Sequence, residues 1–146
     1  VGLAASVLLL LTAVGGIGYA LVAGIPAAQP EPIDPVVEAA PGAIRTDTDD
    51  ALVWYTPSIG TIGMAMAHRF ARHATDGPSC WTIEDIAGTF GIGNSAARVW
   101  HSIERLDRFG IIRRNGDHLA VRLWLPPLTV RLQAQLPSYL AAAYTG

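Results

Sequence analysis

Four nitrogen-bearing side chains recur at helical spacing within the segment NSAARVWHSIERLDRFG, residues 94–110. They are Arg98, His101, Arg105 and Arg108. When residues are placed at 100° intervals around a helix, these four form one stripe, named here the arginine face. An apolar set falls nearly opposite: Ala96, Val99, Ile103, Leu106 and Gly110. A guanidinium donates two parallel hydrogen bonds to guanine O6 and N7, or pairs with a phosphate, so this face suits recognition of guanine or of an anion.

The arginine face contains no acidic residue, although Glu104 and Asp107 lie on the same predicted helix. The alternative interpretation is an ordinary solvated surface, on which these two carboxylates form exposed ion pairs that contribute little stability. The separation of the arginines from the acids favours a binding surface. Trp100 flanks the apolar side.

The arginine face needs other elements to position it, and the first is a predicted amphipathic helix over Ser58–Ala74. Its apolar residues recur every four positions: Ile62, Met66, Phe70 and Ala74. This period is typical of a helix with one face against a core. Asp76-Gly77-Pro78 ends it.

A second, shorter helix is predicted between Thr82 and Phe90. Thr82 can cap its N-terminus, and Glu84 and Asp85 lie in its first turn, where the helix dipole favours acids. Gly91-Ile92-Gly93 then interrupts the helical pattern, and the third helix, about 94–109, carries the arginine face.

A β-hairpin is predicted after the third helix. The pair Asn115-Gly116 favours the positive φ angles of a tight turn between strands. On the strand that follows, apolar residues alternate with others: Leu119, Val121, Leu123 and Leu125. One face of this strand is therefore expected to meet a core.

This order of elements, from about Ser58 to Leu125, resembles the winged helix-turn-helix fold of bacterial DNA-binding proteins. Ala87 and Gly91 match the small residue and the turn glycine of that pattern, and Ala97 falls where a small packing residue is expected. The hairpin looks like the wing. The expected fold is mainly α with a small β-hairpin: a winged helix-turn-helix domain over 51–127, preceded by an apolar N-terminal helix and a Pro-rich linker. All ten basic residues are Arg, which indicates a high-GC genome.

The resemblance implies that the third helix enters the major groove of double-stranded DNA and that the wing, about 111–125, meets the backbone or the minor groove. Arg98, near the start of the helix, is the first choice for a base contact. Arg113 and Arg114 would neutralise phosphates. The full DNA-binding set implied is Asn94, Ser95, Arg98, His101, Arg105, Arg108, Arg113 and Arg114. The implied role is transcriptional regulation, or replication or transfer of a mobile element.

A different class of function stays open: a membrane-tethered winged helix that binds protein and not DNA. Residues 77–146 hold 7 Arg and 5 acids, a net charge of only +2 within a chain of net charge −2.

No phosphate loop, nucleophile elbow or paired catalytic carboxylates occur, so no enzyme activity and no cofactor are expected. His68, His73 and Cys80 are too few and poorly spaced for a metal site.

The two ends of the chain complete the expected organisation. Within the apolar segment 1–28, Leu3–Ile25 runs for 23 residues without a charge, long enough for a transmembrane helix. The alternatives are a signal peptide or a start codon assigned too early. No Lys or Arg lies close enough to the segment to set its orientation in a membrane, because the first is Arg45. Residues 29–50, with four prolines in QPEPIDPVVEAAPGAIRTDTDD, predict an extended linker.

A short apolar helix is expected within 128–146, either covering the core or forming the seam of a homodimer. Leu128, Leu132 and Leu136 recur at helical spacing before Pro137 interrupts the pattern. The expected location is the cytoplasm, with the apolar segment as an optional tether to the inner face of the cell membrane.

Overall fold

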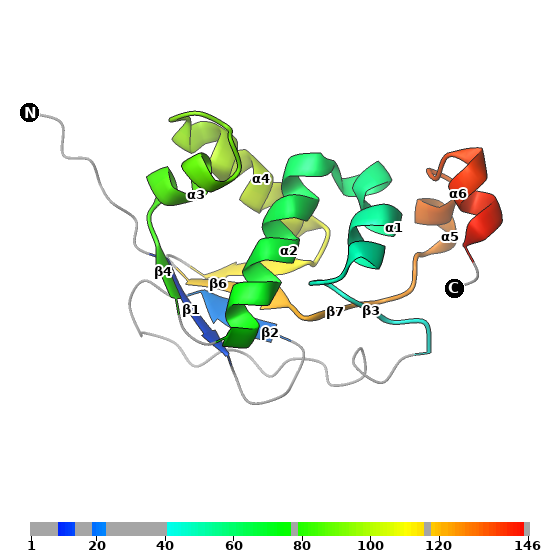
Figure 1. The fold of residues 1–146 in the computed structure, drawn as a ribbon, viewed down its shortest axis with the longest axis horizontal. Coiled ribbons are helices and arrows are strands. Elements are labelled where there is room, and N and C mark those ends of the chain that lie inside the picture. Colours follow the sequence, from blue (N-terminus) through cyan, green and yellow to red (C-terminus); the bar gives the residue numbers. More distant parts are fainter. Residues whose placement is uncertain (1–8, 14–18, 23–40, 77–78, 116–117, 145–146) are drawn as a thin grey trace, which may run out of the picture.

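The computed structural model describes residues 9–13, 19–22, 41–76, 79–115 and 118–144, and all elements named below lie within these ranges (Figure 1). They contain six helices: α1 (Asp49–Ile59), α2 (Thr61–Asp76), α3 (Ile83–Thr89), α4 (Ala96–Arg108), α5 (Val130–Gln133) and α6 (Ser138–Ala143). They also contain seven short strands: β1 (Leu9–Ala13), β2 (Tyr19–Val22), β3 (Ile44–Arg45), β4 (Ser79–Trp81), β5 (Ile112–Asn115), β6 (His118–Arg122) and β7 (Trp124–Leu125). The described chain is thus mainly helical with a smaller antiparallel β component, as expected.

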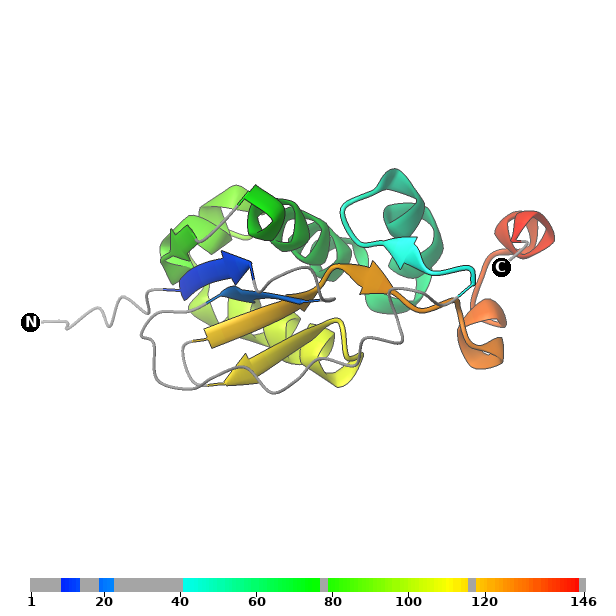
Figure 2. The ribbon, with the colours of Figure 1, turned by 90° about the horizontal axis from the view of Figure 1, so that it is seen from below.

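Five strands form one antiparallel sheet in the order β4-β1-β2-β6-β5 (Figure 2). The predicted hairpin is its edge, because β5 pairs with β6 and places Ile112 opposite Val121 and Asn115 opposite His118. The turn residues Gly116 and Asp117 lie outside the described residues. Strands β3 and β7 form a second, two-stranded sheet.

Helices α1 to α4 lie on one side of the five-stranded sheet, and the core fills the space between these layers (Figure 1). Phe70 of α2 is fully buried there. Its ring meets Trp81 edge-on at 5.5 Å and Phe90 edge-on at 6.1 Å between centroids. Such edge-to-face pairs add specific geometry to the burial of large apolar surface. The pairs tie α2 to both ends of α3.

Helices α3 and α4 begin where their capping residues predict. The Thr82 hydroxyl accepts the Asp85 N–H at 3.0 Å while the Asp85 carboxylate accepts the Thr82 N–H at 3.2 Å, a complete capping box. Ser95 caps α4 by accepting the Arg98 N–H at 3.4 Å. Between the helices, Gly91 takes φ +64°, a left-handed conformation that L side chains adopt only with strain. The short turn between α3 and α4 depends on this glycine.

The predicted helix over Ser58–Ala74 is wrong at its start. Gly60 takes φ +96° and separates α1 from α2, so Ser58 belongs to α1. Helix α1 itself was not expected from the sequence. Met66, Phe70 and Ala74 are buried as predicted, whereas Ile62 is exposed. Met64, two residues and hence about 200° further around α2, is fully buried, so the first turn of the helix meets the core with Met64 and not with Ile62.

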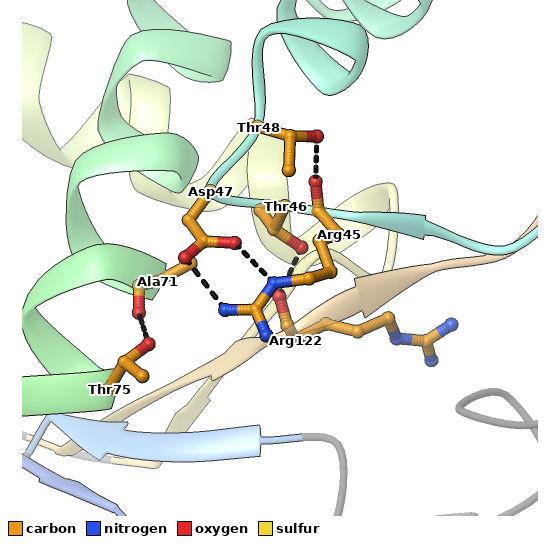
Figure 3. Close-up of polar contacts among 7 residues, drawn as sticks. All are labelled: Arg45, Thr46, Asp47, Thr48, Ala71, Thr75 and Arg122. Atoms are coloured by element: carbon orange, nitrogen blue, oxygen red, sulfur yellow. Dashed lines mark hydrogen bonds and ion pairs between the residues drawn. The ribbon is translucent and has the colours of Figure 1, made fainter.

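The predicted linker over 29–50 is partly folded. Residues 29–40 lie outside the described residues, but β3 pairs with β7, and α1 begins at Asp49. Thr46 is fully buried between them, because its N–H donates to the Leu123 carbonyl at 2.9 Å and its hydroxyl to the Arg122 carbonyl at 2.5 Å (Figure 3). These long-range bonds place the last part of the predicted linker inside the domain.

The two neighbours of Thr46 in the sequence, Arg45 and Asp47, form a bidentate ion pair. Arg45 Nε donates to one carboxylate oxygen of Asp47 at 2.9 Å, and Nη2 donates to the other at 2.8 Å (Figure 3). These hydrogen bonds hold the pKa of Asp47 below its usual value, and the charge of Arg45 acts in the same direction. The pair stabilises the bend that leads from β3 into α1.

The expected N-terminal helix is wrong for the described part of the apolar segment. Residues 9–13 and 19–22 are strands β1 and β2, which fill the sheet between β4 and β6. A run without charges suits a buried strand as well as a helix, and here pairing on both sides satisfies the backbone groups of these strands. In the described residues no helix combines the length and the apolar character that a membrane span requires.

The C-terminal segment forms two short helices, α5 and α6, with Pro137 at the N-cap of α6. Leu128 and Leu136 are buried against the core, and the Leu128 N–H donates to the Tyr144 hydroxyl at 2.8 Å. The Tyr144 ring in turn meets Trp54 of α1 edge-on at 5.2 Å. These contacts are those of a segment that covers the core. A dimer seam stays a prediction.

Candidate nucleic-acid interface

Helix α4 has the amphipathic arrangement that its sequence predicts. Val99 and Ile103 are fully buried, as is Leu106. All four members of the arginine face are exposed: Arg98, His101, Arg105 and Arg108. The terminal members of the predicted apolar side, Ala96 and Gly110, are exposed because they lie at the two ends of the helix. The helix therefore presents its nitrogen donors to solvent.

The first turn of α4 combines small residues with Arg98. Asn94 is exposed just before the helix, and the Ser95 hydroxyl is occupied by its capping bond to the Arg98 N–H. Ala97 is exposed, so the expectation that it packs in the core is wrong. Its position, two residues and hence 200° from buried Val99, explains this. A methyl group at this point leaves room for a surface to approach Arg98 closely.

The guanidinium groups of the arginine face are not neutralised within the described residues. No carboxylate of the described ranges lies within ion-pair distance of Arg98, Arg105 or Arg108. Glu104 and Asp107 are exposed on other sides of the helix. Within the described residues, these two acids therefore do not form ion pairs with the arginine face. Its positive charges are available to a partner.

Arg105 differs from the other members of the arginine face because it also has a structural contact. Its Nη2 donates to the Ser58 carbonyl at the end of α1, at 3.1 Å, and its guanidinium lies 5.8 Å from the centre of the Phe109 ring. The side chain therefore connects α4 to α1. This contact uses one of the five N–H groups of the guanidinium and fixes its position, unlike those of Arg98 and Arg108, for which the described residues show no such contact.

The hairpin strand β5 brings two further arginines beside α4. Arg113 and Arg114 are exposed, and the Arg114 guanidinium lies over the Trp100 ring at 4.1 Å. The Arg114 N–H also donates to the Asp107 carboxylate at 3.3 Å. A cation over an aromatic face is attracted by the ring quadrupole. Trp100 and Asp107 therefore orient β5 against α4, a role that sequence reasoning missed. The one signal for it in the sequence is the aromatic side chain of Trp100 at the flank of the apolar side.

The predicted site residues lie on two different sides of α4. Asn94, Ser95 and Arg98 lie at the start of α4, and Arg105 and Arg108 lie toward its end. Arg114 of β5 instead lies against Trp100 and Asp107, about 160–180° around the helix from Arg98. Within the described residues no three His, Cys, Asp or Glu side chains group as metal ligands. The chemistry offered by this surface is hydrogen-bond donation from fixed positive charges.

Comparisons with protein-family models, with curated proteins and with solved structures give no match.

Proposed function

We propose that the chain is a DNA-binding protein of the winged helix-turn-helix type, with α3 and α4 as the helix-turn-helix and the hairpin β5–β6 as the wing. The observation that carries the proposal is the arginine face: exposed guanidinium groups along one side of α4, without carboxylate partners in the described residues. Strand β5, which contacts α4 through Trp100 and Asp107, carries two more exposed arginines. Its role would be to regulate transcription or to serve replication or transfer of a mobile element.

The dimensions of α4 fit a major groove. Arg98 and Arg108 are ten positions apart, which is about 15 Å along the helix axis, and the major groove of B-DNA is about 12 Å wide. A helix lying in the groove therefore reaches base edges with one end and the phosphates of the groove wall with the other. Arg98, beside the small side chain of Ala97, is the residue placed for a guanine edge.

The remaining donors of the surface supply contacts that do not depend on sequence. Arg108 at the far end of α4 and the two arginines of β5 would pair with phosphates, which positions the protein on the duplex. Such contacts release counterions and make the affinity sensitive to salt. His101, between Arg98 and Arg108 on the arginine face, faces the same groove.

Fluorescence anisotropy with a labelled random duplex at low salt tests the proposal. The variant Arg98→Ala with Arg108→Ala should bind about tenfold to a hundredfold more weakly, which corresponds to ~1.4–2.8 kcal/mol for the two lost contacts together. Arg105 is left unchanged because it also holds α1. The matched control, Arg69→Ala with Arg72→Ala, removes the same charge from exposed positions of α2 and should change the affinity less than about twofold.

Two results would overturn the proposal: no salt-sensitive affinity of the full chain for duplex DNA, or equal losses in the α4 variant and in the α2 control. Circular dichroism of each variant shows whether a loss of binding comes from unfolding. Absence of DNA binding together with a defined protein partner would instead support the protein-interaction module.

A further inference from the structure

A hollow of about 680 Å³ lies between the C-terminal half of α4 and helix α5. Its lining comes from these two helices and the residues beside them: Arg105, Arg108, Phe109, Thr129, Arg131, Leu132 and Gln135. The volume is in the range of small-molecule sites, about 300–1,000 Å³. Arg131 gives the hollow a charge that belongs neither to the expected recognition helix nor to the hairpin.

The lining of the hollow is strongly unbalanced in charge. It contains three guanidinium groups and no carboxylate. In the described residues none of these three arginines has an ion-pair partner. Three like charges around one concave space repel one another and raise the local concentration of anions. An anion in the hollow would relieve that repulsion and accept charge-assisted hydrogen bonds.

One of the three arginines is already fixed in position. The bond from Arg105 to the Ser58 carbonyl and its contact with the Phe109 ring hold this guanidinium against the wall of the hollow. A donor that is held before the ligand arrives loses little side-chain freedom on binding. The hollow therefore contains a partly preorganised anion-binding group.

The rest of the lining indicates what the anion is attached to. Phe109 is 41% exposed and Leu132 is half-buried, so an apolar surface lies beside the charges. Thr129 uses its hydroxyl oxygen to accept the Leu132 N–H at 3.3 Å, which leaves the hydroxyl hydrogen to donate. A flat apolar group and an anionic group can thus be accommodated together.

We propose that this hollow binds a small phosphorylated molecule whose phosphate is carried on an apolar ring. The charge decides between anions, because a phosphate monoester brings about −1.5 to −2 at neutral pH against three guanidinium groups, whereas a carboxylate brings only −1. The phosphate contacts Arg105, Arg108 and Arg131, and the ring lies against Phe109 and Leu132. Since Arg108 also belongs to the surface proposed to bind DNA, the ligand and DNA compete for it, a consequence that rests on the proposed function.

Calorimetric titration of the full chain without DNA tests the hollow directly, with phenyl phosphate as the probe and with inorganic phosphate and phenol as its two halves. Phenyl phosphate should bind at one site per chain, at least about fivefold more tightly than either half. Arg131→Gln should weaken this binding at least about fivefold. Arg72→Gln, which removes a charge from an exposed position of α2, should leave it unchanged.

Phenyl phosphate that binds no more tightly than phenol, or equal effects of the two variants, would overturn the inference. A backbone phosphate of DNA is the other source of the same chemistry. If Arg131→Gln weakens duplex binding while phenyl phosphate does not bind at all, the hollow belongs to the DNA surface and the small-molecule site is refuted. Because the titration contains no DNA, failure of the proposed function leaves its result unaffected.

Discussion

Replacement of Arg105 by Met should destabilise the fold, whereas the same replacement at Arg98 should not. Both arginines are exposed on the same side of α4, but within the described ranges only Arg105 has a structural partner. Met preserves the apolar stem of the side chain in each case, so the comparison isolates the loss of the guanidinium. The two variants therefore separate a structural role from a binding role within one surface.

The expected size of the effect follows from the contacts. A hydrogen bond from a charged donor contributes ~1.5–3 kcal/mol when buried and about 1 kcal/mol when partly solvated, as it is between Arg105 and the Ser58 carbonyl. The contact with Phe109 adds ~0.5 kcal/mol at an exposed site. Arg105→Met should therefore lower the free energy of unfolding by about 1–2 kcal/mol, and Arg98→Met by less than about 0.5 kcal/mol.

Urea denaturation followed by circular dichroism measures both variants. With a urea dependence of about 1–3 kcal/mol per molar, the midpoint should fall by roughly 0.5–1 M for Arg105→Met and stay nearly constant for Arg98→Met. Equal midpoints for Arg105→Met and the unchanged chain would refute the assigned contact between α4 and α1. An equal fall for both variants would refute the distinction between the two arginines.

Two further predictions concern ionisable groups. Hydrogen bonds from Arg45 lower the pKa of Asp47 in the folded protein. The Asp47 carboxylate therefore adds to the free energy of unfolding at pH values above its usual pKa, and this contribution is lost as the pH falls. Asp47→Asn should lower the free energy of unfolding by about 0.5–1 kcal/mol at pH 7, because solvent screens this partly exposed ion pair. In urea titrations the difference between the variant and the unchanged chain should shrink toward pH 2. A difference that does not depend on pH would contradict this prediction. Burial raises the pKa of Tyr55, whose hydroxyl donates to the Pro126 carbonyl. The contribution of this protonated hydroxyl to the free energy of unfolding is therefore complete below about pH 10 and falls as the pH rises further. Tyr55→Phe should lower the unfolding free energy by ~1–2 kcal/mol at pH 7, and alkaline thermal melts should show that gap closing; parallel curves would argue against it.

Elements with local signals were predictable from the sequence. Thr82 and Asp85 lie three residues apart and cap each other, so the start of α3 needs no distant partner. The same holds for Ser95 at the start of α4 and for the period of its buried residues. Because the arginine face follows from the same period, its exposure was predictable as well.

Elements that depend on distant partners were not predictable. The apolar residues of β1 and β2 fit a helix and a strand equally, and pairing with β4 and β6 decides between them. Thr46 is joined to the domain by bonds to the carbonyls of Leu123 and Arg122, the latter 76 positions away. The break at Gly60 likewise depends on how α1 and α2 pack, since glycine also occurs inside helices.

The same distinction applies to the candidate site. Spacing predicts which side of α4 is exposed, but it does not show that Arg105 bonds to α1, 47 positions earlier, or that Arg114 lies over Trp100. Nor does it show that α5 brings Arg131 beside the end of α4. Tertiary contacts decide which arginines hold the fold together and which, among the described residues, point to solvent.

The salt dependence of duplex binding tests the central claim most directly. If Arg108 and the two arginines of β5 pair with phosphates, a plot of log affinity against log salt concentration should have a slope of about −3. Arg113→Gln with Arg114→Gln should reduce that slope by about 2, because each lost phosphate contact removes roughly one unit. A slope near zero for the full chain, or the same steep slope after both substitutions, would contradict the account.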